Sequence, residues 1–156
     1  MGCTHEAESG VYGIALDPEA RYLYWSFATP YFDAILRRSF DGPPTEELVS
    51  EGLEYPYGVA LDTRRGKVYW ADYFGTRISQ ANLDGSQPVA LLESAECLGA
   101  PQNVALDLVR DKLYWTDARN RTICRVNFDG TATQAIFPKF ELTYTPYSIA
   151  VRLSQS

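Results

Sequence analysis

Residues 103–117 read NVALDLVRDKLYWTD, and their pattern occurs twice more upstream. The pair Tyr114-Trp115 has a counterpart 45 residues earlier at Tyr69-Trp70, and another 45 residues before that at Tyr24-Trp25. Self-similarity at a fixed period of this size is typical of repeat proteins in which each repeat is one small supersecondary unit. The chain is therefore best interpreted as a row of similar units.

Two further motifs recur around each Tyr-Trp pair, always in the same order. An apolar run ending in aspartate precedes the pair, and an Asp-Gly dipeptide follows it. The aspartates are Asp17, Asp62 and Asp107, and the dipeptides are Asp41-Gly42, Asp84-Gly85 and Asp129-Gly130. We interpret the three aspartates as residues that form a turn at the end of each apolar run. A partial fourth copy begins at Pro146-Tyr147-Ser148-Ile149. Three motifs in fixed order, three times over, do not arise by chance.

Each repeat predicts four short strands. In the second repeat the apolar run 59–61, the run ending at Trp70, the segment 77–83 and the segment 89–92 are separated by turn residues. Helical periodicity is absent, β-branched and aromatic residues fill the runs, and Asp-Gly favours a tight turn. Four antiparallel strands in about 45 residues are typical of a β-propeller blade. The expected division is an N-terminal segment 1–10, blade 1 at 11–55, blade 2 at 56–100, blade 3 at 101–143, and a first strand of a fourth repeat with the C-terminal tail at 144–156.

These motifs resemble the YWTD repeat, which is the class B repeat of the low-density lipoprotein receptor. Residues 114–117 match the signature in full and residues 69–72 match three of its four positions, whereas Trp25 is followed by Ser26-Phe27 without the acidic residue. The resemblance implies a six-bladed propeller in which the motif residues pack and tie blades together. In this sequence they are Tyr24, Trp25, Tyr69, Trp70, Asp72, Tyr114, Trp115 and Asp117.

Three blades form only half of the ring that the resemblance implies. Each blade has two apolar faces, so a row of three leaves a bare face of several hundred Å² at each end, and burial is worth about 25 cal/mol per Å². A domain has a total stability of only about 5–15 kcal/mol. We expect an all-β half of a six-bladed YWTD-type propeller, completed by dimerisation; the alternative is that the chain is a piece of a longer one. The partial fourth repeat would compete with the partner's first strand.

The alternation of strand direction places two sets of loops on one rim: those before each first strand and those after each Tyr-Trp pair. Tyrosine and arginine on loops held by a rigid scaffold are typical of recognition surfaces. We expect this rim to bind a peptide, a protein or a small apolar ligand, while some of its rings pack between blades. The candidate residues are Tyr31, Phe32, Tyr55, Tyr57, Tyr73, Phe74, Arg77, Gln102, Asn103, Arg119, Arg121, Tyr144 and Tyr147.

Composition and chemistry narrow the remaining function classes. A net charge of −6 argues against nucleic acid, and no apolar run approaches the length of a membrane helix. The single histidine, His5, argues against a histidine-based catalytic triad or metal site. We therefore expect a binding module without cofactor, metal or catalytic residues. An enzyme or carrier with an aromatic channel and a metal-free reaction, such as a cyclisation, stays as the alternative.

Three cysteines, Cys3, Cys97 and Cys124, cannot all pair within one chain, and their spacing matches no zinc pattern. We expect reduced thiols. No secretory signal is visible in the first thirty residues, which favours an intracellular location, although proteins of the resembled family are commonly extracellular.

Overall fold

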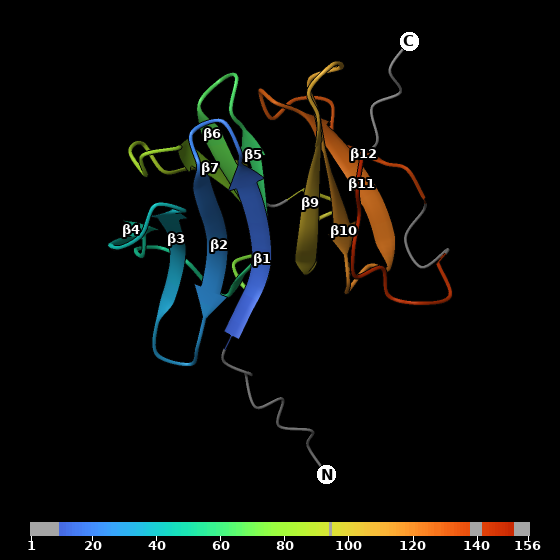
Figure 1. The fold of residues 1–156 in the computed structure, drawn as a ribbon. Helices are drawn as coiled ribbons and strands as arrows, with labels where there is room; N and C mark the ends of the chain where they lie inside the picture. The colour runs from blue at the N-terminus through green and yellow to red at the C-terminus, as the bar shows by residue number, and fades with distance from the viewer. Residues whose placement is uncertain (1–9, 94, 138–141, 152–156) are drawn as a thin grey trace.

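A computed structural model of the chain describes residues 10–93, 95–137 and 142–151. These described residues contain twelve strands in three antiparallel sheets of four, and each sheet falls within one repeat (Figure 1). The strands are β1 (Gly10–Asp17), β2 (Tyr22–Ala28), β3 (Asp33–Ser39), β4 (Thr45–Val49), β5 (Pro56–Asp62), β6 (Lys67–Asp72), β7 (Arg77–Asn82), β8 (Val89–Glu93), β9 (Pro101–Asp107), β10 (Lys112–Asp117), β11 (Thr122–Asn127) and β12 (Gln134–Ala135). Within the described residues, no helix is long and apolar enough to cross a membrane.

Each sheet is a meander in which sequential strands pair, in the orders β1-β2-β3-β4, β5-β6-β7-β8 and β9-β10-β11-β12. The turn between the first two strands of every sheet uses the repeated aspartate. The Oδ1 atoms of Asp17, Asp62 and Asp107 accept hydrogen bonds from backbone N–H groups three residues later, at 2.9, 3.1 and 3.0 Å. A short side chain that accepts a hydrogen bond from a backbone N–H group a few residues later stabilises such a turn. These aspartates therefore close turns, as the sequence predicted.

The first strands of neighbouring sheets approach one another backbone to backbone. A Cβ atom placed on Gly13 would lie 2.5 Å from the carbonyl oxygen of Tyr57, and one on Gly58 would lie 2.6 Å from the Cα of Asn103. Only glycine fits at such an approach. The strands β1, β5 and β9 therefore lie next to each other on the inner side of the three blades.

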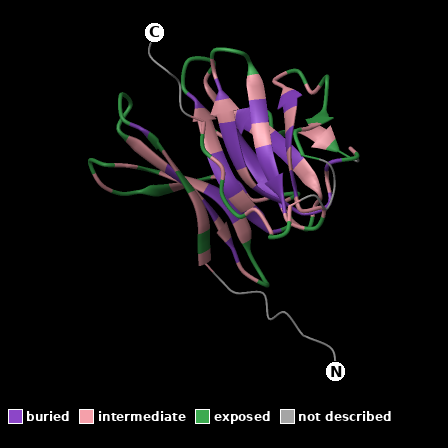
Figure 2. Cartoon of the chain, turned by 90° about the vertical axis from the view of Figure 1, so that its right-hand side faces the viewer, coloured by how far each residue is buried: buried purple, intermediate pink, exposed green. Residues whose placement is uncertain are grey.

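The core lies between the sheets rather than inside any one of them (Figure 2). In the junction between blades 1 and 2, Tyr24 of the first blade and Trp70 of the second share one buried cluster. In the junction between blades 2 and 3, Tyr69 and Trp115 do the same. The motif tyrosine of one blade thus packs against the face of the next blade that carries its motif tryptophan.

Two members of the motif have no such junction. Trp25 and Tyr114 are half-buried, whereas Tyr24, Trp70, Tyr69 and Trp115 are buried. Trp25 lies on the outer face of blade 1 and Tyr114 on the outer face of blade 3, because they alternate with the residues that face the neighbouring blade. Their partial exposure follows from their position at the two ends of the row.

Residues 142–151 form no strand, although the sequence favoured the first strand of a fourth repeat there. A strand needs a hydrogen-bonded neighbour to satisfy its backbone groups. The second strand of a fourth blade, which would provide it, is not among these 156 residues. The edge of β2 where this segment would compete is held by β1, with Ala15 opposite Tyr24.

Candidate functional site

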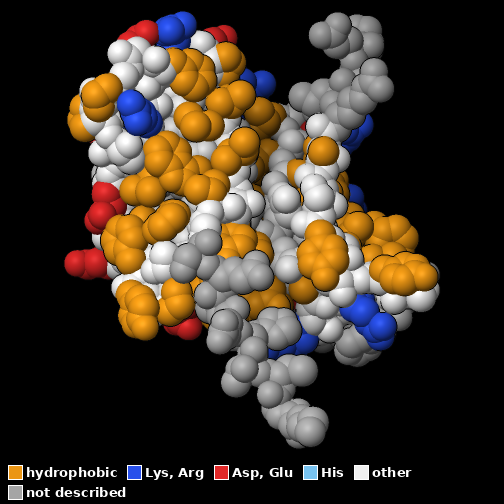
Figure 3. All heavy atoms as spheres, turned by 60° about the horizontal axis from the view of Figure 1, so that its bottom comes forward, with side chains coloured by type: hydrophobic (Ala, Val, Ile, Leu, Met, Phe, Trp, Pro, Cys, Tyr) orange, Lys and Arg blue, Asp and Glu red, His pale blue; other side chains and the backbone are white. Residues whose placement is uncertain are grey.

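The rim singled out by the sequence lies at the lower end of the view in Figure 1 and faces the viewer in Figure 3, where hydrophobic side chains gather on it. Pairing of β5 with β6 places Pro56 opposite Asp72 and brings the two rim loops of blade 2 together. Backbone hydrogen bonds join them: Tyr73 N–H donates to the Tyr55 carbonyl at 3.1 Å, and Phe74 N–H donates to that of Glu54 at 3.0 Å. The loops are held together as one surface.

Five aromatic rings form a continuous cluster on this surface, which we call the aromatic platform: Tyr12, Tyr55, Tyr57, Tyr73 and Phe74. Ring centroids lie 4.3 Å apart for Tyr12 and Tyr57, 5.0 Å for Tyr57 and Tyr73, 4.9 Å for Tyr73 and Phe74, and 5.4 Å for Phe74 and Tyr55. The Tyr12 and Tyr55 hydroxyls lie 3.1 Å apart and form a hydrogen bond. Tilted and edge-to-face pairs at these separations are favourable beyond the area they bury.

The platform has a buried base and an open top. Tyr55 is only 7% exposed, Tyr12, Tyr57 and Tyr73 are half-buried, and Phe74 is 56% exposed. Tyr55 therefore supports the surface from below, rather than offering its ring to a ligand as the sequence led us to expect. Rings held by one another on two neighbouring blades lose little conformational entropy when a partner binds.

Tyr12 belongs to the platform but was missed by the sequence interpretation, which considered loops only. It lies within β1, at the position that Tyr57 occupies in the second repeat, because Tyr12-Gly13 aligns with Tyr57-Gly58. That alignment is the signal that would have found it.

The motif aspartates fix the rim loops in place. Asp72 is fully buried and accepts hydrogen bonds from Glu54 N–H at 2.8 Å and from Arg77 Nε and Nη2 at 3.0 and 2.9 Å. Burial raises the pKa of Asp72, and the hydrogen bonds from Arg77 oppose that rise. Arg77 also donates to the Gly52 carbonyl. Arg77 is thus bound to its own scaffold, and its expected contact with a ligand is not supported by this arrangement.

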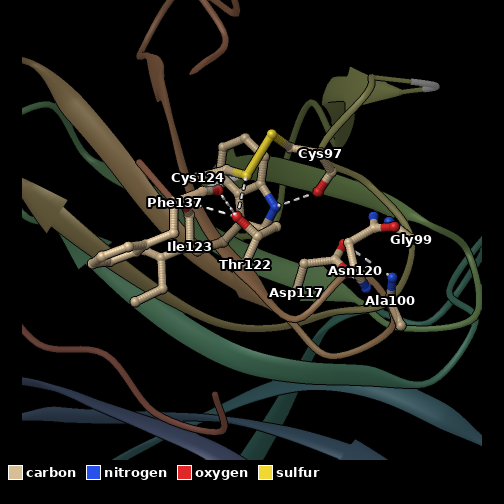
Figure 4. Close-up of a disulfide and its surroundings, with 10 residues drawn as sticks. Cys97, Gly99, Ala100, Asp117, Asn120, Thr122, Ile123, Cys124 and Phe137 are labelled. Carbon is tan, nitrogen blue, oxygen red and sulfur yellow. Dashed lines mark hydrogen bonds between the residues drawn. A yellow bond between two sulfur atoms is a disulfide. The ribbon is translucent and has the colours of Figure 1, made fainter. Parts of the chain in front are cut away.

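In blade 3 a buried motif aspartate likewise holds the rim loops, whereas in blade 1 an aspartate outside the motif does so. Asp117 accepts from the backbone N–H groups of Gly99, Ala100 and Asn120 at 2.5, 3.1 and 2.7 Å (Figure 4). In blade 1, where the motif lacks its aspartate, the Asp33 carboxylate accepts from Tyr55 N–H at 2.8 Å. Asp33 thereby ties the first blade to the loop that carries the base of the platform.

The expectation of reduced cysteines is wrong for two of the three. Cys97, in the segment that connects blades 2 and 3, forms a disulfide with Cys124 of β11, with their Cα atoms 6.3 Å apart (Figure 4). Trp115 Nε1 donates to the Cys97 carbonyl at 3.1 Å. The two cysteines are 27 residues apart in sequence and meet because the connecting segment folds back over blade 3. Cys3, like His5, lies outside the described residues.

The other expected rim residues differ in how far they are exposed. Phe32 packs on Phe27, with ring centroids 6.2 Å apart, and Gln102 is buried below the surface. Asn103 N–H donates to Thr116 Oγ1 at 3.1 Å within blade 3, and Arg121 is half-buried. Five of these residues are exposed: Tyr31, Phe32, Arg119, Tyr144 and Tyr147. Among the described residues, no three His, Cys, Asp or Glu side chains gather into a group that could hold a metal ion.

Three four-stranded meanders have closely packed inner strands, meet in two junctions built from a motif tyrosine and a motif tryptophan, and are held at their rims by aspartates. They define a partial β-propeller of the YWTD type. Comparison with solved structures supports this class. The chain superposes on a chain of the nidogen/laminin complex with a TM-score of 0.76 and 28% identity, covering 86% of this chain and 50% of that one. Two more distant structures, a protein of unknown function from Bacteroides thetaiotaomicron and a TolB-like protein from Agrobacterium tumefaciens, share the fold at TM-scores of 0.67 and 0.66 and identities of 18% and 16%.

Sequence comparison leads to the family. The chain is 38% identical over 78 residues to mouse low-density lipoprotein receptor-related protein 5 and 35% identical over 85 residues to mouse nidogen-2. These matches cover 50% and 54% of this chain but only 5% and 6% of those proteins. A human low-density lipoprotein receptor-related protein 5-like protein is 34% identical over 80 residues, which are 31% of its length. No family model matches the chain. Over about half its length the chain is homologous to the propeller regions built from YWTD, or low-density-lipoprotein-receptor class B, repeats.

Proposed function

We propose that this chain is a non-enzymatic binding module that takes a protein or peptide partner on the aromatic platform. The observation that carries the proposal is the continuous network of five rings, open to solvent at Phe74. Large rigid rings with hydroxyl groups supply contact area and hydrogen bonding at low entropic cost, which is why tyrosine is frequent in binding surfaces. The homologous nidogen structure, a complex with laminin, supports a binding role for this type of scaffold.

The chemistry of the platform defines the kind of partner that fits. Its rings carry no net charge, and Arg77, which follows Phe74 by three residues, pairs with Asp72 at 2.9 Å. We therefore expect an apolar or aromatic segment of a protein, held by burial and by hydrogen bonds to tyrosine hydroxyls. Because ionic attraction contributes little, raising the salt from ~0.1 M to ~0.5 M should leave the affinity almost unchanged.

The proposal is tested with a random peptide library displayed on phage and selected on the purified protein. The selected peptides are then measured by calorimetry against the wild type and against the variants Phe74→Ala and Tyr73→Ala. We expect each variant to weaken binding about tenfold or more, a change of about 1.4 kcal/mol.

Val109→Ala is the matched control, because Val109 is an exposed apolar residue at the turn after β9, on the opposite rim. It should bind the selected peptides as the wild type does. The proposal fails if no peptide is selected, or if the selected peptides bind the Phe74 and Tyr73 variants unchanged.

The Cys97–Cys124 disulfide bears on where this binding takes place. Disulfides persist in oxidising compartments and are rare in the cytosol. We propose that the module works in an oxidising environment, in contrast to the intracellular location that the sequence favoured.

The proposal includes self-association, because a row of three blades has two end faces that need cover. The outer faces of blades 1 and 3 carry exposed hydrophobic side chains, among them Ile14, Leu16 and Ile136. Apolar patches of this kind are typical of interfaces.

A further inference from the structure

The two internal junctions give a template for what the open ends of the row should contact. Each junction joins a face carrying the motif tyrosine to a face carrying the motif tryptophan: Tyr24 with Trp70, then Tyr69 with Trp115. The face of blade 3 that carries Tyr114 and the face of blade 1 that carries Trp25 are left over. One chain therefore exposes both halves of a third junction, at its opposite ends.

The end face of blade 1 carries apolar residues at the positions that are packed in the template. Ile14 is 65% exposed, whereas Val59 and Val104, at the same position of the next two repeats, are buried. Phe40 is 49% exposed, whereas Leu83 and Phe128, which precede the Asp-Gly turn in the same way, pack against the internal clusters.

The end face of blade 3 shows the complementary set. Ile136 and Phe137 are exposed, whereas Leu91 and Leu92, one repeat earlier, pack against the cluster between blades 2 and 3. Repeat positions that are buried in the junctions inside the row are therefore exposed at its two ends, because no neighbouring blade covers them there.

We infer that two copies of this chain close end to end, with blade 1 of each seated on blade 3 of the other through Trp25 and Tyr114. This inference rests on the self-association proposed above and adds the surfaces that meet. A second copy is the occupant that the structure favours, because the two end faces carry the two complementary halves of the junction that occurs twice inside the chain. Contacts between unlike faces form a ring when the rotation closes.

The template also predicts contacts within the new junction. Tyr69 stacks on Phe128 of the next blade at 5.5 Å, and Arg65 lies over the same ring at 5.3 Å. Tyr114, Arg110 and Phe40 occupy the corresponding positions of the repeat. We therefore expect Tyr114 of one copy to stack on Phe40 of the other copy, with Arg110 of the first copy over the same ring.

Two positions of blade 1 depart from the template. In the junction between blades 2 and 3, Arg65 also pairs with Asp111 of blade 3. Blade 1 has Arg21 at the position of Asp111, and the carboxylate near it is that of Asp41, 2.9 Å from Arg21. Arg38 stands where Ala81 and Val126 are buried, so its aliphatic stem must cover the junction while its charge stays in water.

The experiment uses one charged variant for each end of the full chain. Ile14→Asp alters only the blade 1 face and Ile136→Lys only the blade 3 face, and both side chains are exposed, so each variant should fold. In a homodimer of either variant, both junctions contain one charged residue. We expect the wild type to be dimeric at micromolar concentration by analytical ultracentrifugation, and each variant alone to weaken dimerisation at least about tenfold.

Mixing the two variants gives the decisive result. A mixed pair has one junction that contains both the Asp and the Lys, whose charges have opposite signs, and one junction that is entirely wild type. We therefore expect the mixture to form dimers at concentrations where each variant alone is monomeric. Circular dichroism checks that both are folded, and Phe74→Asp on the rim should leave dimerisation unchanged.

The outcomes separate the contact from the self-association. A monomeric wild type, with its end faces open, overturns both. A wild-type dimer that neither variant weakens, or variants whose mixture stays monomeric, overturns this contact alone. Filaments or a larger ring overturn the closure by two copies. If Ile14 matters but Ile136 does not, blade 1 meets blade 1 and the inference is wrong. Peptide binding on the rim is independent of all these results.

Discussion

The two junctions between blades are built from the same repeated residues, yet they are not equally secured. In the junction between blades 2 and 3, Trp115 Nε1 donates to the Cys97 carbonyl, and Cys97 is bonded covalently to Cys124. In the junction between blades 1 and 2, Trp70 Nε1 is buried without a hydrogen-bond partner among the described groups. Gly52 and Ser79 stand where the second junction has its cysteines.

This difference shows that the repeat determines which faces meet but not how firmly they are held. The connecting segment before blade 3 is joined to that blade by the disulfide, and its backbone carbonyl at Cys97 accepts a hydrogen bond from Trp115. Both segments are also held at the rim, by Asp72 and Arg77 before blade 2 and by Asp117 before blade 3. The second junction should therefore be the more stable of the two.

Truncating the two core tryptophans gives the largest expected effect on this comparison. Trp115→Ala and Trp70→Ala should each lower the free energy of unfolding by about 3–5 kcal/mol, because both are almost fully buried. Trp115→Ala should be the more damaging, since it also leaves the Cys97 carbonyl unpaired. Urea denaturation at one fixed protein concentration measures both, and an equal or larger loss for Trp70→Ala would contradict the ranking.

Removing the disulfide should bring the two junctions closer in stability. The double variant Cys97→Ser/Cys124→Ser should unfold with about 3.5 kcal/mol less free energy than the wild type, the amount expected for a crosslinked loop of this size. Reductant should destabilise the wild type by a similar amount and leave the double variant unchanged. A thiol count gives an independent check: alkylation of the protein unfolded in denaturant without reductant should modify one of three cysteines, and modification of all three would show that the pair is not bonded.

A gentler substitution isolates the indole hydrogen bond. Phenylalanine keeps the ring in each junction and removes the N–H group. Trp115→Phe should cost about 1 kcal/mol more than Trp70→Phe, because only Trp115 loses a hydrogen bond. Thermal unfolding of the two variants at one protein concentration measures the difference. Equal losses would indicate that the Trp115 bond adds no net stability.

Much of the fold could be predicted from the sequence, because its determinants are local and repeated. Asp107 and its counterparts close the turns that the sequence assigned to them, and the twelve strands follow the repeat. The site was only partly predictable. Tyr57, Tyr73 and Phe74 come together because alternating strand direction places their loops on one rim. Arg77, in contrast, is held by the carboxylate of Asp72, and the spacing of five residues between them did not indicate this contact. Tyr12 joins them from within a strand.

By itself the sequence determined the blade, its period and the rim on which its loops gather, because hydrophobic alternation and Asp-Gly turns act over a few residues. Only the tertiary structure decided which side chains share an environment. The Cys97–Cys124 bond, the buried state of Tyr55 and the open faces around Trp25 and Tyr114 all depend on how one blade docks on the next. Docking joins residues tens of positions apart, and a one-dimensional pattern does not specify those distances.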